Sequence, residues 1–306
     1  MAQPAPPTLH RTKQPGLSHL LDLRLGPATT YPVAAAHDAI ARGLAAAKVY
    51  AFASADFPGA AISQVFDSDD TTAVGAFIFD PTGNSRATAF TFTAGAYQTL
   101  TVPGASASIA TGIATTGLII GAYADLSGTA HGFTLTGGSF TDIDFPAATS
   151  TLAIGVNDPG QIVGSFTNAA GSHGFLHDTS TFNAIDFPAA TSTEAAGINN
   201  SGDIVGRFSD ATGSHGLLLH GGTFTPIDFP LATSTTAFGI NDAAEIAGSY
   251  IDAEGNQHGF VFAGGAFSTV DVAGAVSSEL TRIKNSGSVT GRYTDAVTGV
   301  HGLIGQ

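Results

Sequence analysis

Five histidines and five aspartates recur at nearly constant spacing, and imidazole and carboxylate groups can together bind ligands, bind metals or move protons. The aspartates stand in an Asp-Phe-Pro triplet or its variants, and the histidines open a His-Gly-Phe or His-Gly-Leu segment. The set consists of His131, His173, His215, His258, His301, Asp56, Asp144, Asp186, Asp228 and Asp271. One interpretation is a ring of ligand or metal sites. The other, which regular recurrence favours, is a structural hydrogen bond between a histidine and an aspartate in each repeat.

A second set of charged residues stands where the other copies of the repeat carry neutral ones. These candidate catalytic residues are Glu194, Glu279, Arg207, Arg282 and Arg292. Two carboxylates with arginine neighbours can bind a polar ligand or perform acid–base chemistry, as in a lyase, lactonase or hydrolase. The alternative is that they form solvated ion pairs with no role in chemistry.

Three carboxylates lie close together at Asp67, Asp69 and Asp70, and carboxylate oxygens are ligands that Ca²⁺ prefers. They form a candidate weak calcium site, and Ca²⁺ is the one cofactor that the sequence suggests. The glycine and terminal glutamate typical of a calcium loop do not follow, so an ordinary acidic turn is the alternative. Phosphate-binding loops, nucleophile elbows and zinc signatures are absent from the sequence.

The elements that must position these residues repeat along the chain. The Asp-Phe-Pro triplet and its variants begin at residues 56, 101, 144, 186, 228 and 271, with steps of 45, 43, 42, 42 and 43 residues. A period of about 40–45 residues with four short strands is typical of a β-propeller blade. In the copy that begins at residue 186, strands are predicted over 193–198, 203–208, 215–219 and 223–227.

The two ends of the repeat array complement each other. An aromatic residue stands four positions before each marker, and Phe52 holds this place before Asp56. Residues 49–55 therefore have the pattern of an outer strand, whereas the last copy ends without one. Pairing the two would remove exposed strand edges. The sequence thus predicts an all-β, six-bladed β-propeller of four-stranded blades over 49–306, with the N-terminal strand closing the last blade.

Two further positions are constant in all six copies. A glycine lies inside the second strand, at Gly75, Gly121, Gly164, Gly206, Gly248 and Gly291. We expect it to allow close approach of a neighbouring blade. Two residues later comes an aromatic residue, at Phe77, Tyr123, Phe166, Phe208, Tyr250 and Tyr293, on the same face of the sheet. These rings are expected to form the core between blades together with the aromatic residues of the outer strands.

Residues 1–48 differ from the rest in composition and form a predicted N-terminal extension. Residues 1–16 are rich in proline and predicted to be disordered, whereas 18–25 and 33–48 have helical propensity. We expect the extension to pack on the propeller; a pro-segment, partner docking or assembly are alternatives. It carries a net charge of +3, from five basic and two acidic residues. Because the whole sequence carries −14, residues 49–306 carry −17. An acidic body disfavours nucleic acid and anionic membrane surfaces as partners. The sequence has no apolar run of about 18 residues, so no membrane span is expected.

The segment Gly-Ile-Asn-Asn-Ser-Gly-Asp-Ile-Val-Gly (197–206), the later His215-Gly216-Leu217 and the segment from Phe224 to Pro230 together resemble HAF-family repeats. The resemblance covers about 56–306 and departs in the first copy, which has Thr88-Ala89-Phe90 in place of the histidine triplet. This bacterial family has no assigned general activity, so the resemblance implies a propeller and an exported protein, secreted or periplasmic, but no reaction. The first residues lack the layout of a signal peptide, which keeps a cytoplasmic protein as the alternative.

We therefore expect a binding or interaction module without a catalytic motif, whose partner is a small molecule, a glycan or a protein. The alternative is an enzyme with a polar site at the mouth of the central channel.

Overall fold

The computed structural model describes residues 50–69, 71–80, 86–297 and 299–306, and every regular element in these ranges is a β-strand. The predicted N-terminal extension, with its two helices, lies outside the described residues. Among the described residues no helix is long and apolar enough to cross a membrane. The chain is therefore all-β wherever its structure is described.

The strands pair as antiparallel four-stranded units, numbered here in chain order. Unit 1 contains β2 (Ile62–Ser68), β3 (Thr72–Ile78), β4 (Thr88–Thr93) and β5 (Ala96–Thr99), and unit 2 contains β6 (Ala107–Ile113), β7 (Ile119–Ala124), β8 (Ala130–Thr136) and β9 (Ser139–Ile143). Unit 3 contains β10 (Ser150–Val156), β11 (Ile162–Asn168), β12 (Gly171–Asp178) and β13 (Thr181–Ile185), and unit 4 contains β14 (Ser192–Ile198), β15 (Ile204–Ser209), β16 (Ser214–His220) and β17 (Thr223–Ile227). Unit 5 contains β18 (Ser234–Ile240), β19 (Ile246–Ile251), β20 (Gln257–Ala263) and β21 (Ala266–Val270), and unit 6 contains β22 (Ser277–Ile283), β23 (Val289–Thr294), β24 (Val300–Gly305) and β1 (Phe52–Ser54).

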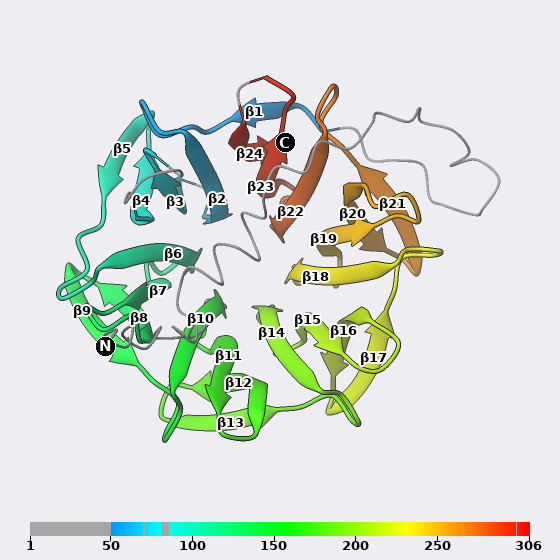
Figure 1. Ribbon diagram of the computed structural model, residues 1–306, viewed down its shortest axis with the longest axis horizontal. Coiled ribbons are helices and arrows are strands. Elements are labelled where there is room, and N and C mark those ends of the chain that lie inside the picture. Colours follow the sequence, from blue (N-terminus) through cyan, green and yellow to red (C-terminus); the bar gives the residue numbers. More distant parts are fainter. Residues whose placement is uncertain (1–49, 70, 81–85, 298) are drawn as a thin grey trace, which may run out of the picture.

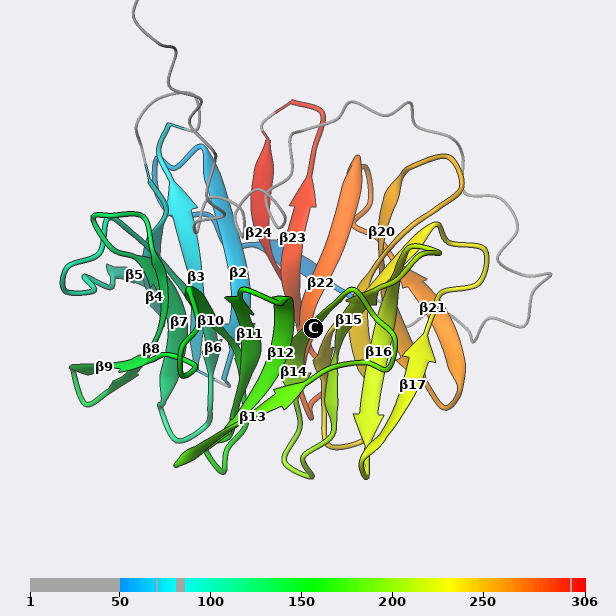
Figure 2. The same ribbon diagram turned by 60° about the horizontal axis from the view of Figure 1, so that its bottom comes forward.

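The units stand around a central axis, with the first strand of each unit innermost (Figure 1). Their connections gather at two opposite faces (Figure 2). We call one the histidine face; it carries the connections from second to third strands and from each unit to the next. The opposite face, called the asparagine face, carries the turns from first to second and from third to fourth strands. This arrangement is that of a β-propeller.

The chain ends meet in unit 6, as the sequence predicts. Strand β1 pairs antiparallel with β24, with Phe52 opposite Gly305 and Ser54 opposite Leu303. On the histidine face, His301 Nδ1 lies 2.8 Å from Asp56 Oδ2. The expected outer strand over 49–55 is thus confirmed with narrower bounds, and the contact between His301 and Asp56 beside it joins residues 245 positions apart.

Aromatic rings join neighbouring units. Phe145, in the connection that leaves unit 2, stacks on Phe166 of unit 3 with ring centroids 3.6 Å apart. Phe166 in turn stacks on His173 at 5.1 Å. The same three-ring arrangement recurs as Phe187, Phe208 and His215, and as Phe229, Tyr250 and His258. The predicted aromatic core between units is confirmed.

The reason why a glycine is required in each second strand differs from the predicted one. A Cβ atom at Gly206 would collide with the carbonyl oxygen of Glu194, on the inner strand of the same unit. The register shifts at this place, between Ala195 and Gly197, so a bulge turns that carbonyl toward the glycine. The prediction of close approach from a neighbouring blade was therefore wrong, because a bulge cannot be seen in the spacing alone.

We predict that removing β1 destabilises the protein because it exposes the edge of β24. A chain lacking residues 1–55 should unfold at least about 5 °C below a chain lacking residues 1–48, which keeps β1. Differential scanning calorimetry of the two truncated chains measures this difference. Equal midpoints would mean that the pairing of β1 with β24 does not stabilise the fold.

Candidate functional site

The inner strands approach one another most closely near the end that reaches the asparagine face. A Cβ atom at Gly155 would lie 2.6 Å from the carbonyl oxygen of Ala196, and one at Gly197 would lie 2.7 Å from that of Phe238. Gly112 and Gly239 hold the same register position in units 2 and 5. Units 1 and 6 instead carry Asp67 and Arg282 there, so two side chains of opposite charge occupy the axis.

The guanidinium of Arg282 lies on the axis, and the residue is 7% exposed. Its Nη1 donates to the carbonyl oxygens of Phe238 and Thr281, both at 2.8 Å. Its Nη2 donates to the carbonyl oxygens of Ile154 and, at 3.4 Å, Thr111. One side chain therefore joins inner strands of units 2, 3, 5 and 6. Burial lowers the pKa of this group, and the negative charge of Asp67 opposes that effect.

Asp67 is the counter-ion of this cation and is itself 2% exposed. Its Oδ2 lies 3.7 Å from Arg282 Nε, and its Oδ1 lies 2.7 Å from Lys284 Nζ. Oδ2 also accepts a hydrogen bond from the backbone N–H of Ile113 in unit 2. Both oxygens of this carboxylate are therefore occupied by cations and backbone.

Two of the proposed calcium ligands, Asp67 and Asp69, have separate partners in the structure. Asp69 Oδ1 accepts hydrogen bonds from the backbone N–H groups of Thr71 and Thr72 and so stabilises a turn, whereas Asp67 faces the axis. Asp70 lies outside the described residues. Within the described ranges, no group of three His, Asp or Glu side chains is arranged to hold a metal. For Asp67 and Asp69, the structure supports the interpretation as structural residues.

Around the axis, amide side chains join the turns of the asparagine face. Asn157 Nδ2 donates to the carbonyl oxygen of Asn199, and Asn199 Nδ2 donates to that of Asn241. Asn241 Nδ2 donates in the same way to the carbonyl oxygen of Lys284. Each bond reaches from one unit to the next, so this asparagine is an interunit contact that repeats along the chain.

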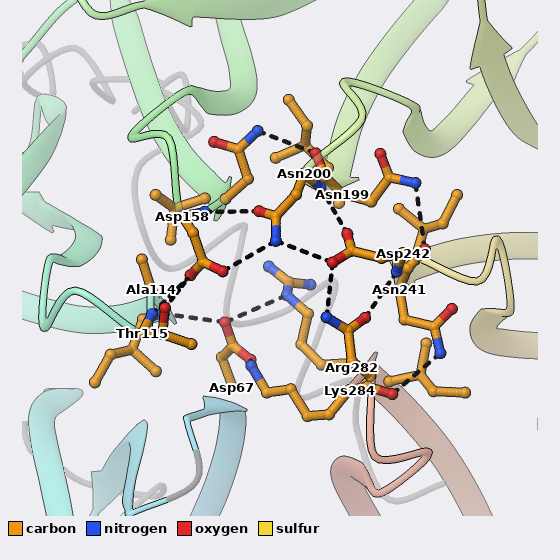
Figure 3. Close-up of a pocket in the computed structure, with 18 residues that line it drawn as sticks. Asp67, Ala114, Thr115, Asp158, Asn199, Asn200, Asn241, Asp242, Arg282 and Lys284 are labelled. Atoms are coloured by element: carbon orange, nitrogen blue, oxygen red, sulfur yellow. Dashed lines mark hydrogen bonds and ion pairs between the residues drawn. The ribbon is translucent and has the colours of Figure 1, made fainter.

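A second chain of hydrogen bonds runs through the next residue of each turn (Figure 3). Asn200 Nδ2 donates to Asp158 Oδ2 and to Asp242 Oδ2, both at 3.0 Å. Thr115 donates to Asp158 from the one side, and Asn285 donates to Asp242 from the other. Burial raises the pKa of Asp158, but the hydrogen bonds from Thr115 and Asn200 and the charge of Lys284 outweigh it, so the pKa is lowered.

These residues surround a cavity of about 100 Å³ at the channel mouth, lined on one side by Arg282 and Lys284 and on the others by the turns. Such a space holds a few water molecules. Its polar groups are already hydrogen-bonded to one another. The mouth of the channel is therefore a structural contact between units, with little room for a reactant.

The other candidate catalytic residues lie elsewhere. Glu194 and Arg207 are a cross-strand pair in unit 4, with Oε2 and Nη2 3.4 Å apart. Glu279 and Arg292 are the equivalent pair in unit 6, with Oε1 and Nε 3.3 Å apart. Neither glutamate lines the cavity at the channel mouth. The alternative of an enzyme requires Glu194, Glu279, Arg207, Arg282 and Arg292 to converge in one pocket, and they do not.

These ion pairs also differ from the solvated pairs considered above. Glu279 is 3% exposed and Arg292 8% exposed. Gln257 of unit 5 donates a further hydrogen bond to Glu279 Oε2 at 3.0 Å, which connects two units. The description as solvated pairs is wrong for unit 6, because both side chains, on the first and second strands of the unit, are buried.

The histidines and aspartates of the repeat form the hydrogen bonds that the second interpretation predicts. The Nδ1–Oδ distance is 2.9 Å for His131–Asp144, 2.8 Å for His173–Asp186, 3.0 Å for His215–Asp228, 2.8 Å for His258–Asp271 and 2.8 Å for His301–Asp56. Each pair joins the start of a third strand to the end of a fourth strand. The histidine ring is thereby fixed against the aromatic ring beneath it.

Most of these histidines also have a second carboxylate. Nε2 of His258 lies 3.2 Å from Asp252 Oδ2, and Nε2 of His301 lies 3.4 Å from Asp295 Oδ2. His131 and His215 have equivalent neighbours at 3.8 and 3.6 Å. The hydrogen bond to Asp271 is the largest cause that raises the pKa of His258, and burial opposes it.

The fold and these contacts define the class of protein as an all-β propeller. TolB from Acinetobacter baumannii is similar in structure, with a TM-score of 0.55 and 10% sequence identity over 77% of this chain and 64% of TolB. The β-propeller domain of the Trilobed protease from Pyrococcus furiosus has a TM-score of 0.50 and 11% identity over 77% of this chain and 79% of that domain.

The aligned part of this chain thus spans less than two thirds of the TolB chain. At these identities the similarity shows the β-propeller fold alone. Comparisons with protein-family models and with curated proteins give no match.

We predict that Arg282→Met lowers the free energy of unfolding by about 3–5 kcal/mol, because buried carbonyl oxygens and Asp67 lose their partner. Arg86→Met is the control: Arg86 is exposed, its side chain donates one long hydrogen bond to Ser106 Oγ at 3.5 Å, and a loss below about 1 kcal/mol is expected. Urea denaturation of both variants measures the difference. Equal losses would show that Arg282 has no special structural role.

The histidine pairs predict a pH dependence of stability. Because the folded-state pKa of His258 is raised, its stabilising contribution is present below the unfolded pKa of about 6.5 and is lost as pH rises through the folded pKa. The melting temperature of His258→Gln should therefore fall further below wild type at pH 6 than at pH 8.

His177 provides a control of opposite sign, since burial lowers its pKa and protonation then opposes folding. His177→Gln should gain stability relative to wild type as the pH falls from 8 to 6. Parallel changes in the two variants would contradict this assignment.

Proposed function

We propose that this protein is a non-catalytic binding propeller of the HAF-repeat type, with units 1 to 6 as its six blades. The recurring four-stranded pairing and the closure of β24 by β1 support the blade number. The in-phase His-Gly-Phe and His-Gly-Leu triplets support the family. This family also favours a secreted or periplasmic location over a cytoplasmic one.

The placement of the charged residues favours binding over catalysis. An acid–base site needs convergent groups that can exchange protons with a substrate. Here Arg282 is saturated by carbonyl oxygens, and Glu194 and Glu279 are paired with arginines in different units. The alternative of a lyase, lactonase or hydrolase at the channel mouth therefore has no support from this geometry.

The observation that carries the proposal is the distribution of exposed apolar side chains. Among the described residues, all the large hydrophobic side chains that are exposed lie on the histidine face: Phe79 (54%), Leu126 (87%), Leu231 (71%), Ile251 (37%) and Val297 (89%). They come from units 1, 2, 4, 5 and 6. The asparagine face has none of these side chains, so within the described ranges the histidine face is the one that offers apolar contacts to another protein.

The same face is strongly acidic. Its connections carry Asp56, Asp80, Asp125, Asp144, Asp186, Asp210, Asp228, Asp252, Glu254, Asp271 and Asp295, whereas Arg86 is the one described Lys or Arg in them. Charge complementarity directs such a face toward a basic partner. The partner we propose is a protein whose surface presents apolar side chains among lysines and arginines.

We predict that the triple variant Leu126→Ser, Leu231→Ser and Val297→Ser loses the protein partner that the wild type captures from extracts of the native cells. The partner should elute as salt rises from 50 to 300 mM, because the contact is partly electrostatic. His220→Ala, a change at an exposed residue on the asparagine face, is the control and should retain the partner.

Affinity capture with quantitative mass spectrometry, followed by calorimetry with the purified partner, measures both effects. Retention of the same proteins by the triple variant would place binding on another surface. Capture of no protein at all by the wild type would remove this proposal.

A further inference from the structure

One cross-strand pair near the asparagine face differs in unit 1 from all other units. At this register position the first strand and the second strand contribute two branched aliphatic residues in units 2 to 6. The pairs are Ile113–Ile119, Val156–Ile162, Ile198–Ile204, Ile240–Ile246 and Ile283–Val289. Unit 1 has Ser68 opposite Ala73 instead. In the other units these two side chains fill the contact with the preceding unit. In unit 1 they are replaced by the much smaller side chains of serine and alanine.

The larger aliphatic pair fills the contact wherever it is present. Ile198 and Ile204 of unit 4 pack with Leu176 of unit 3 in one apolar cluster. Ile240 and Ile246 of unit 5 likewise pack with Leu218 of unit 4. Residues of this kind normally close the space between neighbouring sheets, and a packed interior leaves few voids larger than a water molecule.

Between units 6 and 1, the exchange leaves a cavity of about 490 Å³. Ser68 and Ala73 line it from unit 1 together with Phe92, and Ile304 lines it from unit 6. This volume lies within the range of about 300–1,000 Å³ that is usual for small-molecule sites. The cavity is distinct from the channel mouth, with which it shares no lining residue.

The cavity is lined by both apolar and hydroxyl-bearing side chains. Phe92, Ala73 and Ile304 offer an apolar surface, whereas hydroxyl groups come from Ser68, Thr72 and Ser288. Among the described residues, Asp69 is the one charged side chain that lines the cavity, and its Oδ1 accepts hydrogen bonds from the turn. Hydroxyl groups both donate and accept, so they suit a ligand that also carries hydroxyl groups.

We propose that the cavity between units 6 and 1 is a binding site for a neutral, hydroxylated ring of monosaccharide size. The apolar face of such a ring packs on Phe92, and its hydroxyl groups exchange hydrogen bonds with the serine and threonine side chains. None of the described residues that line the cavity is basic, which disfavours an anionic ligand. This site does not depend on protein docking through the histidine face, since it lies near the asparagine face.

The test uses the full chain and five probes: glucose, galactose, mannose, fucose and N-acetylglucosamine, each at 50 mM. At least one should raise the melting temperature of the wild type and give saturation-transfer signals in NMR, because it binds the native state alone. The double variant Ser68→Ile, Ala73→Val restores the pair found in unit 6. It should fold with an unchanged or higher melting temperature and bind the sugar at least tenfold more weakly.

Two single variants keep the test decisive if the double variant folds poorly. Ser68→Ala removes the hydroxyl without filling the cavity and should weaken binding about threefold or more, the size expected for one lost hydrogen bond. Ser201→Ile, on an exposed serine of the equivalent turn in unit 4, should bind as the wild type does.

The proposal is overturned if none of the five sugars binds the wild type. Sugar binding that survives in the double variant also overturns it, because the ligand then lies elsewhere. A lower melting temperature of the folded double variant, without sugar binding by the wild type, would mean that another part of the chain fills the cavity.

Discussion

The structure depends on how the inner strands satisfy their backbone at the axis. Bulges next to the glycines bring neighbouring inner strands so close that a Cβ atom is excluded at Gly155, Gly197 and Gly239. Carbonyl oxygens then face the axis with no strand to pair with, and a buried carbonyl without a donor is costly. Arg282 supplies donors to four of them from a single planar group, and this geometry suits arginine better than lysine.

A buried cation in turn requires a buried anion, and Asp67 meets this requirement from the neighbouring unit. Lys284 balances the second oxygen of Asp67, and the asparagine and aspartate side chains of the turns extend the network outward. The asparagine face is therefore committed to holding the units together. The histidine face combines structural histidine pairs with exposed apolar side chains, and the cavity between units 6 and 1 arises where the repeat changes its packing residues.

The repeat was sufficient to predict the strands, the pairing of the chain ends and the histidine–aspartate hydrogen bonds, because each follows from spacing and alternation.

The role of Asp67 could not be predicted. The first turn of unit 1 is one residue shorter, so Asp67 lies eight residues before Gly75, whereas Gly197 lies nine before Gly206. Spacing therefore placed Asp67 in a turn, while the register places it opposite Arg282 at the axis. Likewise, charge alone suggested that Glu279 is solvated, but it is buried between Arg292 and Gln257 of the neighbouring unit, a contact that spacing does not reveal. The exchange of an aliphatic pair for Ser68 and Ala73 was visible in the sequence, yet only the register shows that these two residues face each other.

The closure of unit 6 also has a consequence for how the chain is made. Interunit bonds such as Asn157 to Asn199 connect residues 42 positions apart, so each can form soon after its partner leaves the ribosome. Strand β1 must instead wait for β24, which is the last strand among the described residues. At typical rates of synthesis of about 5–20 residues per second, that delay is roughly 10–50 seconds. Throughout this interval the early units present an unpaired edge, so the nascent chain, more than the finished protein, is the form that needs protection from aggregation.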